Sequence, residues 1–260
     1  MQSWRLLQLE PSALREPDSF TAPAELGVDG AHLPATLFHL ANGPGVDSEA
    51  VYAEVANRVS QLIGDVRSVY VDREERRQLL TLYAIGADKT AHPARALSDG
   101  TLRFLALTVL SLDPNAQGVI CMEEPENGIH VERIPAMLEL LQDLTADVTE
   151  DDGDEETGAR LRQVIVNTHS PSVVLQVPDE SLIYADAAER RSGDATIRAL
   201  RLRCLPGTWR TQDNGGSTIP KGVLLAYLNP VGRQHPARRP RVVDRQDLQQ
   251  YLLPFPGAAS

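Results

Sequence analysis

The chain has 260 residues, of which 42% are hydrophobic and 23% charged, and its formal net charge is −11. This length and apolar content allow a sizeable core and one or two domains. No apolar run approaches the roughly 20 residues of a membrane-spanning helix, and the amino-terminal residues lack a signal-peptide pattern. We therefore expect no membrane partner. Two separated cysteines, Cys121 and Cys204, indicate reduced thiols in the cytoplasm.

Residues 1–94 predict an amino-terminal segment of helices and antiparallel strands. The first 30 residues are rich in proline and short polar residues, which predicts an irregular lead-in. The pattern then predicts helices over Leu33–Leu40 and Glu49–Leu62, and paired strands over Arg67–Asp72 and Gln78–Ile85. The turn Asn42-Gly43-Pro44-Gly45 separates the two helices.

A helix with a polar start follows this segment. Its apolar positions, at helical spacing, are Leu102, Leu105, Ala106, Val109 and Leu110. Ser98 is a good N-cap residue, and Gly100 allows the backbone to come close to a ligand. Free N–H groups and the positive end of the helix dipole make such a start a natural anion site. The same pattern is, however, more often only a helix cap.

An apolar run that begins at Val119 ends in two adjacent carboxylates, Glu123 and Glu124, followed by Pro125. Sites in α/β nucleotide-binding folds lie outside the carboxyl ends of parallel strands. One acid can hold Mg²⁺, and the other can orient or deprotonate an attacking water. The pattern fits equally well a strand that ends in a solvated acidic turn.

A second β-branched strand begins at Gln163 and ends in the polar cluster Asn167-Thr168-His169-Ser170. Between the two strands, residues 133–144 predict an amphipathic helix. A lone histidine at a strand end is more often structural than catalytic. Here it is the third polar strand-end or helix-start element in an ordered series, which favours a functional role.

In order, Leu97–Thr101, the Glu-Glu-Pro-Glu-Asn-Gly stretch from Glu123, and Asn167–Ser170 resemble three motifs of ABC-type ATPases. These motifs are the signature, the Walker B strand with its D-loop, and the switch histidine. The likeness is to the SMC- and RecF-like ATPases rather than to transporter subunits, and it is sharpest over residues 95–183. It implies an α/β, P-loop NTPase-type core with a parallel sheet flanked by helices, plus a small antiparallel β layer. The ATPase lobe would then span residues 95–230.

The resemblance also implies a role for the strand-end residues. Glu123 matches the carboxylate associated with Mg²⁺, and Glu124 matches the catalytic carboxylate that positions the hydrolytic water. His169 matches the histidine that bonds to the γ-phosphate of ATP. Asn127 and Gly128 lie in the stretch that matches the D-loop, which would touch a partner subunit.

Ser98, Asp99, Gly100 and Thr101 match the signature, which in these ATPases reaches across a dimer to the other subunit's ATP. Asp99 and Thr101 depart from the commoner Leu-Ser-Gly-Gly-Gln sequence. An aspartate there would repel the γ-phosphate unless it points away or pairs with a cation such as Arg103.

The chain carries no Gly-x-x-x-x-Gly-Lys-Ser/Thr phosphate loop, the Walker A motif. Its only lysines are Lys89 and Lys221; Asp88 replaces the glycine that would precede Lys89, and Pro220 precedes Lys221. Three explanations stay open: the carboxyl-terminal part of a longer enzyme, a split subunit whose partner supplies the loop, or a degenerate relative without ATP hydrolysis. Retention of both glutamates argues against the last.

These features lead us to expect an ATP hydrolase that acts in a head-to-head dimer, with a second copy or with a Walker A-bearing partner. An ATPase of this kind fits both DNA repair and phage defence, with DNA or a nuclease as a further partner. The alternative is a catalytically inactive interaction module that contributes only the trans signature face.

The carboxyl-terminal part is less informative. Residues 143–158 form an acidic run that predicts a mobile insertion, and residues 231–260 form a basic, proline-rich tail that touches phosphates or serves as a linker. Late strands are predicted over Ser181–Ala185 and Thr196–Leu202, and short helices over Leu224–Leu228 and Asp247–Leu253.

Overall fold

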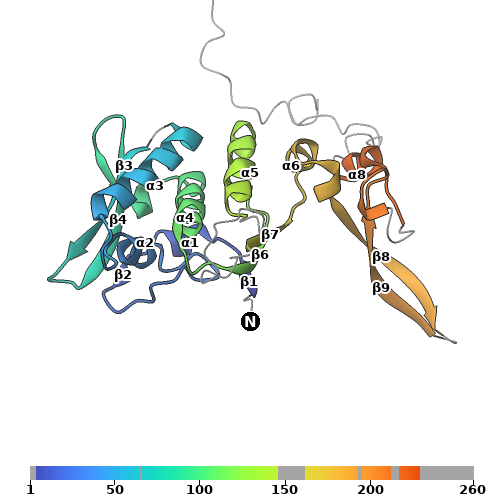
Figure 1. The fold of residues 1–260 in the computed structure, drawn as a ribbon, viewed down its shortest axis with the longest axis horizontal. Coiled ribbons are helices and arrows are strands. Elements are labelled where there is room, and N and C mark those ends of the chain that lie inside the picture. The colour runs from blue at the N-terminus through green and yellow to red at the C-terminus, as the bar shows by residue number, and fades with distance from the viewer. Residues whose placement is uncertain (1–3, 65, 146–161, 193–194, 212–216, 229–260) are drawn as a thin grey trace, which may run out of the picture.

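A three-stranded parallel sheet forms the centre of the chain in the computed structural model, which describes residues 4–64, 66–145, 162–192, 195–211 and 217–228 (Figure 1). Its strands are β1 (Trp4–Leu7), β6 (Gly118–Glu123) and β7 (Arg162–Asn167), in the order β1-β6-β7. Leu6 lies opposite Cys121, which lies opposite Ile165. This arrangement brings the carboxyl ends of β6 and β7 side by side.

The expectation of an irregular lead-in over residues 1–30 is wrong. This segment contains β1, the short helix α1 (Pro11–Leu14) and the short strand β2 (Asp18–Ser19). β1 is only four residues long and pairs in parallel with β6, which is distant in the sequence. A strand of four residues is too short to show a recognisable alternation of apolar and polar residues. Its partner strand is also distant in the sequence, so no local pattern predicts the pairing.

Helix α4 (Asp99–Leu112) carries an unbroken buried stretch, in which every residue from Leu102 to Leu110 is buried. Its neighbours are α1, α2 (Leu33–Ala41), α3 (Ser48–Ile63) and α5 (Ile134–Asp143), and these helices contribute to one hydrophobic core cluster (Figure 1). Asp47 caps α3 by accepting hydrogen bonds from the amides of Glu49 and Ala50. All four predicted helices of this region are confirmed within one or two residues.

An antiparallel sheet packs beside this core. β3 (Val66–Glu74) pairs with β4 (Leu79–Gly86), and β4 also pairs with β2 and with β5 (Ala91–Pro93). Lys89 lies exposed in the turn between β4 and β5, with a φ of 62°, so it opens no helix. The predicted fold class is therefore confirmed: a parallel sheet flanked by helices, with an additional antiparallel layer.

A long hairpin follows helix α6 (Pro171–Gln176). Its strands, β8 (Ile183–Ser192) and β9 (Ala195–Cys204), are longer than the sequence predicts, and helix α8 (Lys221–Leu228) comes after them. Asp186 accepts hydrogen bonds from Arg201 and Arg203 across the hairpin. The bond from Arg201, supported by that from Arg203 and opposed by desolvation, lowers the pKa of Asp186 to about 2.

Three 3-10 turns complete the elements: Ala94–Ala96, Val131–Arg133 and Asp179–Ser181. Within the described ranges, no helix has both the length and the apolar character to span a membrane. Cys121 and Cys204 are free thiols. Most of the acidic run 143–158, the tail 231–260 and its helix over Asp247–Leu253 lie outside the described residues. The division of the chain after residue 94 stays a prediction.

Candidate functional site

The carboxyl ends of β6 and β7 place the candidate site. Glu123, the last residue of β6, lies opposite Asn167, the last residue of β7. The Glu124 amide donates a hydrogen bond of 2.8 Å to the Asn167 carbonyl, which ties the two strand ends together beyond the ladder. The two motifs that the sequence predicts at strand ends are therefore neighbours in space.

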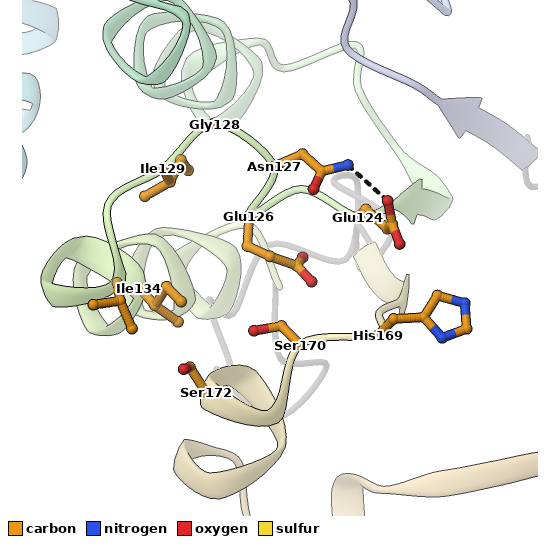
Figure 2. Close-up of a pocket in the computed structure, with 10 residues that line it drawn as sticks. Glu124, Glu126, Asn127, Gly128, Ile129, Ile134, His169, Ser170 and Ser172 are labelled. Atoms are coloured by element: carbon orange, nitrogen blue, oxygen red, sulfur yellow. Dashed lines mark hydrogen bonds between the residues drawn. The ribbon is translucent and has the colours of Figure 1, made fainter. Parts of the chain in front are cut away.

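Glu124 has an unusual backbone conformation. Its φ is +42°, in the left-handed region, and Pro125 follows it, which disfavours helical conformations at the preceding residue. A residue other than glycine held in a sparsely populated region costs about 1–3 kcal/mol, and such residues cluster at functional sites. The strain is held by the bond to Asn167 and by a 2.6 Å bond from Asn127 Nδ2 to Glu124 Oε2 (Figure 2). Asn127 thereby sets the direction of the Glu124 carboxylate.

A cavity of about 400 Å³ opens at these strand ends, and Figure 2 shows its lining. Four of the predicted site residues lie along it: Glu124, Asn127, Gly128 and His169. Glu126, Ser170 and Ser172 add further polar groups, and Ile129, Val131 and Ile134 form its apolar part. The structure thus brings the candidate catalytic carboxylate and the candidate switch histidine to one pocket. The turn of residues 126–129, named the D-loop turn below after the motif that it resembles, lines the same pocket.

The predicted signature residues lie on another side of the D-loop turn. Ser98 caps α4, as predicted, by accepting a hydrogen bond of 3.2 Å from the Thr101 amide, and none of the residues from Ser98 to Thr101 lines the cavity. The signature residues contact the cavity only indirectly, because the start of α4 packs against Gly128, which lines it. A Cβ on Gly100 would lie 3.2 Å from the Gly128 carbonyl oxygen, so these two glycines allow the helix start and the turn to touch.

The cation that pairs with Asp99 is Arg15, and the sequence did not identify it. Arg15 Nη2 lies 2.5 Å from Asp99 Oδ1 and donates a second hydrogen bond, of 3.0 Å, to the Leu97 carbonyl. Arg103, which the sequence suggested, is buried, and no ion pair joins it to Asp99 in the described structure. The charge of Asp99 is also favourable at this end of α4 because the helix dipole is positive there.

Two residues of the site were missed by sequence reasoning, Glu126 and Thr168. The Glu126 side chain is buried, and its Oε1 accepts a hydrogen bond from the Thr168 hydroxyl. The only available signal was a third acid in Glu-Glu-Pro-Glu and a hydroxyl directly before His169. Neither pattern shows that the two side chains meet, because they lie in loops that follow two different strands.

The carboxylate at the end of β6 fits a Mg²⁺ ion whose remaining ligands are water and substrate oxygens. Glu123 is exposed at the end of β6, and no group of three or more acidic, histidine or cysteine side chains able to hold a metal occurs among the described residues. Mg²⁺ commonly binds to one or two carboxylates, with water and phosphate oxygens as the other ligands. One carboxylate at the strand end is compatible with that pattern, whereas a site made of protein ligands alone is not.

One face of the parallel sheet lacks the cover that parallel sheets usually have. α4 and α5 lie over the face of Leu7, Ile120 and Met122 (Figure 1). On the opposite face, Trp4, Leu6 and Ile165 are 74%, 61% and 52% exposed. β7 has no further strand on its outer edge within the described part of the chain. Parallel sheets are almost always covered on both faces, so this face and edge form an incomplete layer.

Residues 48–175 match a protein family described as "AAA domain, putative AbiEii toxin, Type IV TA system". The matched segment includes all three stretches that resemble ATPase motifs, and the match confirms the resemblance of this segment to an AAA/ABC-like ATPase domain. No curated protein matches the chain.

Similar solved structures include SMC ATPase heads. An Smc head domain with coiled coil and joint from Pyrococcus yayanosii is 13% identical with a TM-score of 0.41, covering 71% of this chain and 29% of that chain. An Smc head bound to the C-terminal domain of ScpA, from Pyrococcus furiosus, is 13% identical with a TM-score of 0.39, covering 60% and 35%. A third, from work on ATP-driven dimerization and DNA stimulated activation of SMC ATPases, is 11% identical with a TM-score of 0.40, covering 72% and 94%. The chain thus spans about a third of the first two proteins.

Proposed function

We propose that this chain provides the hydrolytic half of an ATP site in an ABC-type ATPase that works as a head-to-head dimer. The observation that carries the proposal is the meeting of Glu124, Asn127 and His169 at one pocket, with Glu124 held in a left-handed conformation. The family match of residues 48–175 supports an ATPase-type domain. A strained backbone at Glu124, together with a side-chain amide that orients its carboxylate, is energetically costly for a turn whose only role is structural.

Each strand-end residue has a task in this proposal. Glu124, whose carboxylate is oriented by Asn127, accepts a hydrogen bond from the attacking water and aligns it with the γ-phosphate. His169 lines the same pocket and donates a hydrogen bond to a γ-phosphate oxygen. Glu123 would hold a Mg²⁺ ion, which would neutralise the developing charge on the phosphate oxygens. The signature residues Ser98 to Thr101 face the nucleotide of the partner subunit.

The phosphate loop comes from another polypeptide segment in this proposal, and the incomplete sheet gives it a place. A phosphate loop connects a strand to a helix. A strand parallel to β7 on its open edge would deliver the loop at its carboxyl end, beside Asn167 and His169. The helix of that unit would cover the exposed face of Trp4, Leu6 and Ile165. The uncovered face and the open edge of β7 are thus both used by one strand–loop–helix unit.

ATP turnover by the native protein that contains this chain, compared with its Glu124→Gln variant, tests the proposal. General-base catalysis contributes about 10²–10⁴-fold, so we expect a loss of kcat in that range with nucleotide binding retained. Glu132→Gln is the matched control, because the Glu132 side chain is 84% exposed on the same loop and does not line the cavity. Equal turnover by wild type and Glu124→Gln would exclude this assignment of the catalytic carboxylate.

The same experiment distinguishes the inactive interaction module. That function requires association independent of ATP and no measurable hydrolysis in the wild-type protein. ATP-dependent association that Glu124→Gln strengthens, by trapping the unhydrolysed nucleotide, supports the enzymatic function instead.

A further inference from the structure

Glu126 connects three parts of the site, and no motif assigns it a function. It lies between Glu124 and the D-loop turn, and only 9% of the residue is exposed. One carboxylate oxygen, Oε1, accepts the hydrogen bond from the Thr168 hydroxyl, whereas Oε2 has no partner in the described structure. In Figure 2 the side chain points into the cavity, toward the segment that carries His169 and Ser170. A buried carboxylate that is only half satisfied is uncommon unless it serves a site.

The hydrogen bonds around Glu126 fix the backbone on both sides of His169. Thr168, just before the histidine, donates its hydroxyl proton to Glu126. Ser170, just after it, donates its amide proton to the Thr168 hydroxyl oxygen over 3.0 Å. The exposed imidazole therefore projects from a three-residue segment whose conformation depends on the Glu126 carboxylate.

Glu126 is equally tied to the surface that would face a partner subunit. Its carbonyl oxygen accepts a 2.9 Å hydrogen bond from the Ile129 amide, which closes the D-loop turn. Gly128, within that turn, packs against Asp99 and Gly100 at the start of α4. Movement of the turn or of the helix start must therefore move the backbone of Glu126.

A third connection is electrostatic and reaches α4. Arg103 is buried, and its Nε has no hydrogen-bond partner among the described residues. Desolvation lowers the pKa of Arg103, whereas the charges of Glu10, Asp99 and Glu126 raise it. Arg103 and Glu126 thus attract each other, and each retains one unpaired buried polar atom, Nε and Oε2, among the described residues.

We propose that Glu126 is a positioning residue that transmits the state of the partner-facing surface, formed by the D-loop turn and the start of α4, to His169 through Thr168. This inference rests on the proposed function, because it assumes that His169 acts on the γ-phosphate. It assigns to Glu126 no contact with the reacting atoms. Its effect on turnover passes through the histidine.

Kinetics of the native protein with variants at positions 168, 169 and 126 test the route. Thr168→Val removes the hydroxyl that bridges Glu126 and Ser170, and displacement of a reacting group by about 1 Å can cost on the order of 100-fold. We expect kcat to fall by about 10- to 100-fold with little change in the KM for ATP, and Thr168→Ser to recover most of that loss. Glu126→Ala should resemble Thr168→Val.

A double-variant cycle separates positioning from general stability. If Thr168 acts through His169, then Thr168→Val combined with His169→Ala is no slower than His169→Ala alone. Multiplied effects of the two substitutions would overturn the inference. A wild-type kcat in both Glu126→Ala and Thr168→Val, with Glu124→Gln inactive, would also overturn the inference. That result would leave the proposed function intact.

NMR of the full chain without nucleotide gives a readout independent of catalysis. We expect the imidazole signals of His169 to shift or broaden in Thr168→Val and Glu126→Ala but to keep their wild-type positions in Glu132→Gln. Thermal unfolding of the same samples identifies a variant that is merely unfolded, and Glu126→Gln then replaces Glu126→Ala because it keeps the volume and one acceptor oxygen. Unchanged His169 signals in folded variants at both positions refute the connection.

Discussion

Gly128 allows the D-loop turn to be perturbed with a matched control elsewhere in the chain. Its φ is +76°, and Gly64, which ends α3, has a φ of +72°. Alanine at either position pays the cost of a left-handed conformation, about 1–2 kcal/mol. A Cβ on Gly64 meets nothing within 4 Å, and one on Gly128 lies 3.4 Å from the Asp99 Cβ, an ordinary van der Waals distance. The two substitutions should therefore destabilise the fold by similar amounts, within about 1 kcal/mol of each other, the width of that range.

Their functional effects should differ. Gly128 lines the cavity and adjoins Asn127, which orients Glu124, whereas Gly64 lies at the end of a helix on the antiparallel layer. Urea denaturation measures the two losses of stability, and ATP turnover of the native protein measures the functional loss. We expect Gly128→Ala to lose turnover and Gly64→Ala to keep it at temperatures where both are folded. Equal turnover of the two variants, or a Gly128→Ala protein as stable as wild type, would refute the reasoning.

Three further predictions concern charges and the exposed sheet face. Arg15→Gln and Arg5→Gln each remove a partly exposed ion pair worth at most about 1 kcal/mol, but only Arg15→Gln, which releases Asp99, should weaken ATP-dependent dimerisation measured by light scattering. The low folded-state pKa of Asp186, about 2 against an ordinary 3.8, means that its contribution to stability is present above pH 3.8 and is lost as pH falls through 2. An NMR titration should therefore place its midpoint near 2 in wild type and closer to 3.8 in Arg201→Gln; a wild-type midpoint near 3.8 contradicts the ion pair. Ile165→Asp should reduce co-purification of the Walker A-bearing segment, whereas Ile197→Asp, at an equally exposed hairpin position, should not.

Local periodicity was enough to predict the helices and the antiparallel pair β3–β4, because each of these elements repeats its own pattern over eight residues or more. The hairpin β8–β9 extends further than predicted. Alanines and charged residues around Asp186 resemble a helix or loop in isolation, and the bonds from Arg201 and Arg203 that hold the strands together come from the opposite strand. Stabilisation by cross-strand pairs is invisible until the register is known.

The same limit applies to the site. The polar residues at the strand ends could be recognised because the ends of parallel strands meet by geometry. The bond between Arg15 and Asp99 joins residues 84 positions apart, and the one between Thr168 and Glu126 joins residues 42 positions apart. Each depends on how elements pack rather than on the pattern within an element. The candidate catalytic residues were therefore more predictable than the residues that hold them in place.

The charge of the pocket gives a physical reason for a site completed by a second segment. Glu124 and Glu126 line the cavity, Glu123 ends the adjoining strand, and none of the residues that line the cavity is a lysine or an arginine. The charge of the buried Arg103 acts on Glu126 from α4, outside that lining. ATP brings several negative charges to this acidic surface, so it must arrive with compensating cations. Of the two lysines, Lys89 is exposed in a turn and Lys221 pairs with Asp179, and Arg15 is already bonded to Asp99. One Mg²⁺ cannot balance both the nucleotide and these carboxylates. In the proposed function, a lysine-bearing phosphate loop on the open edge of β7 would supply the remaining positive charge at the pocket.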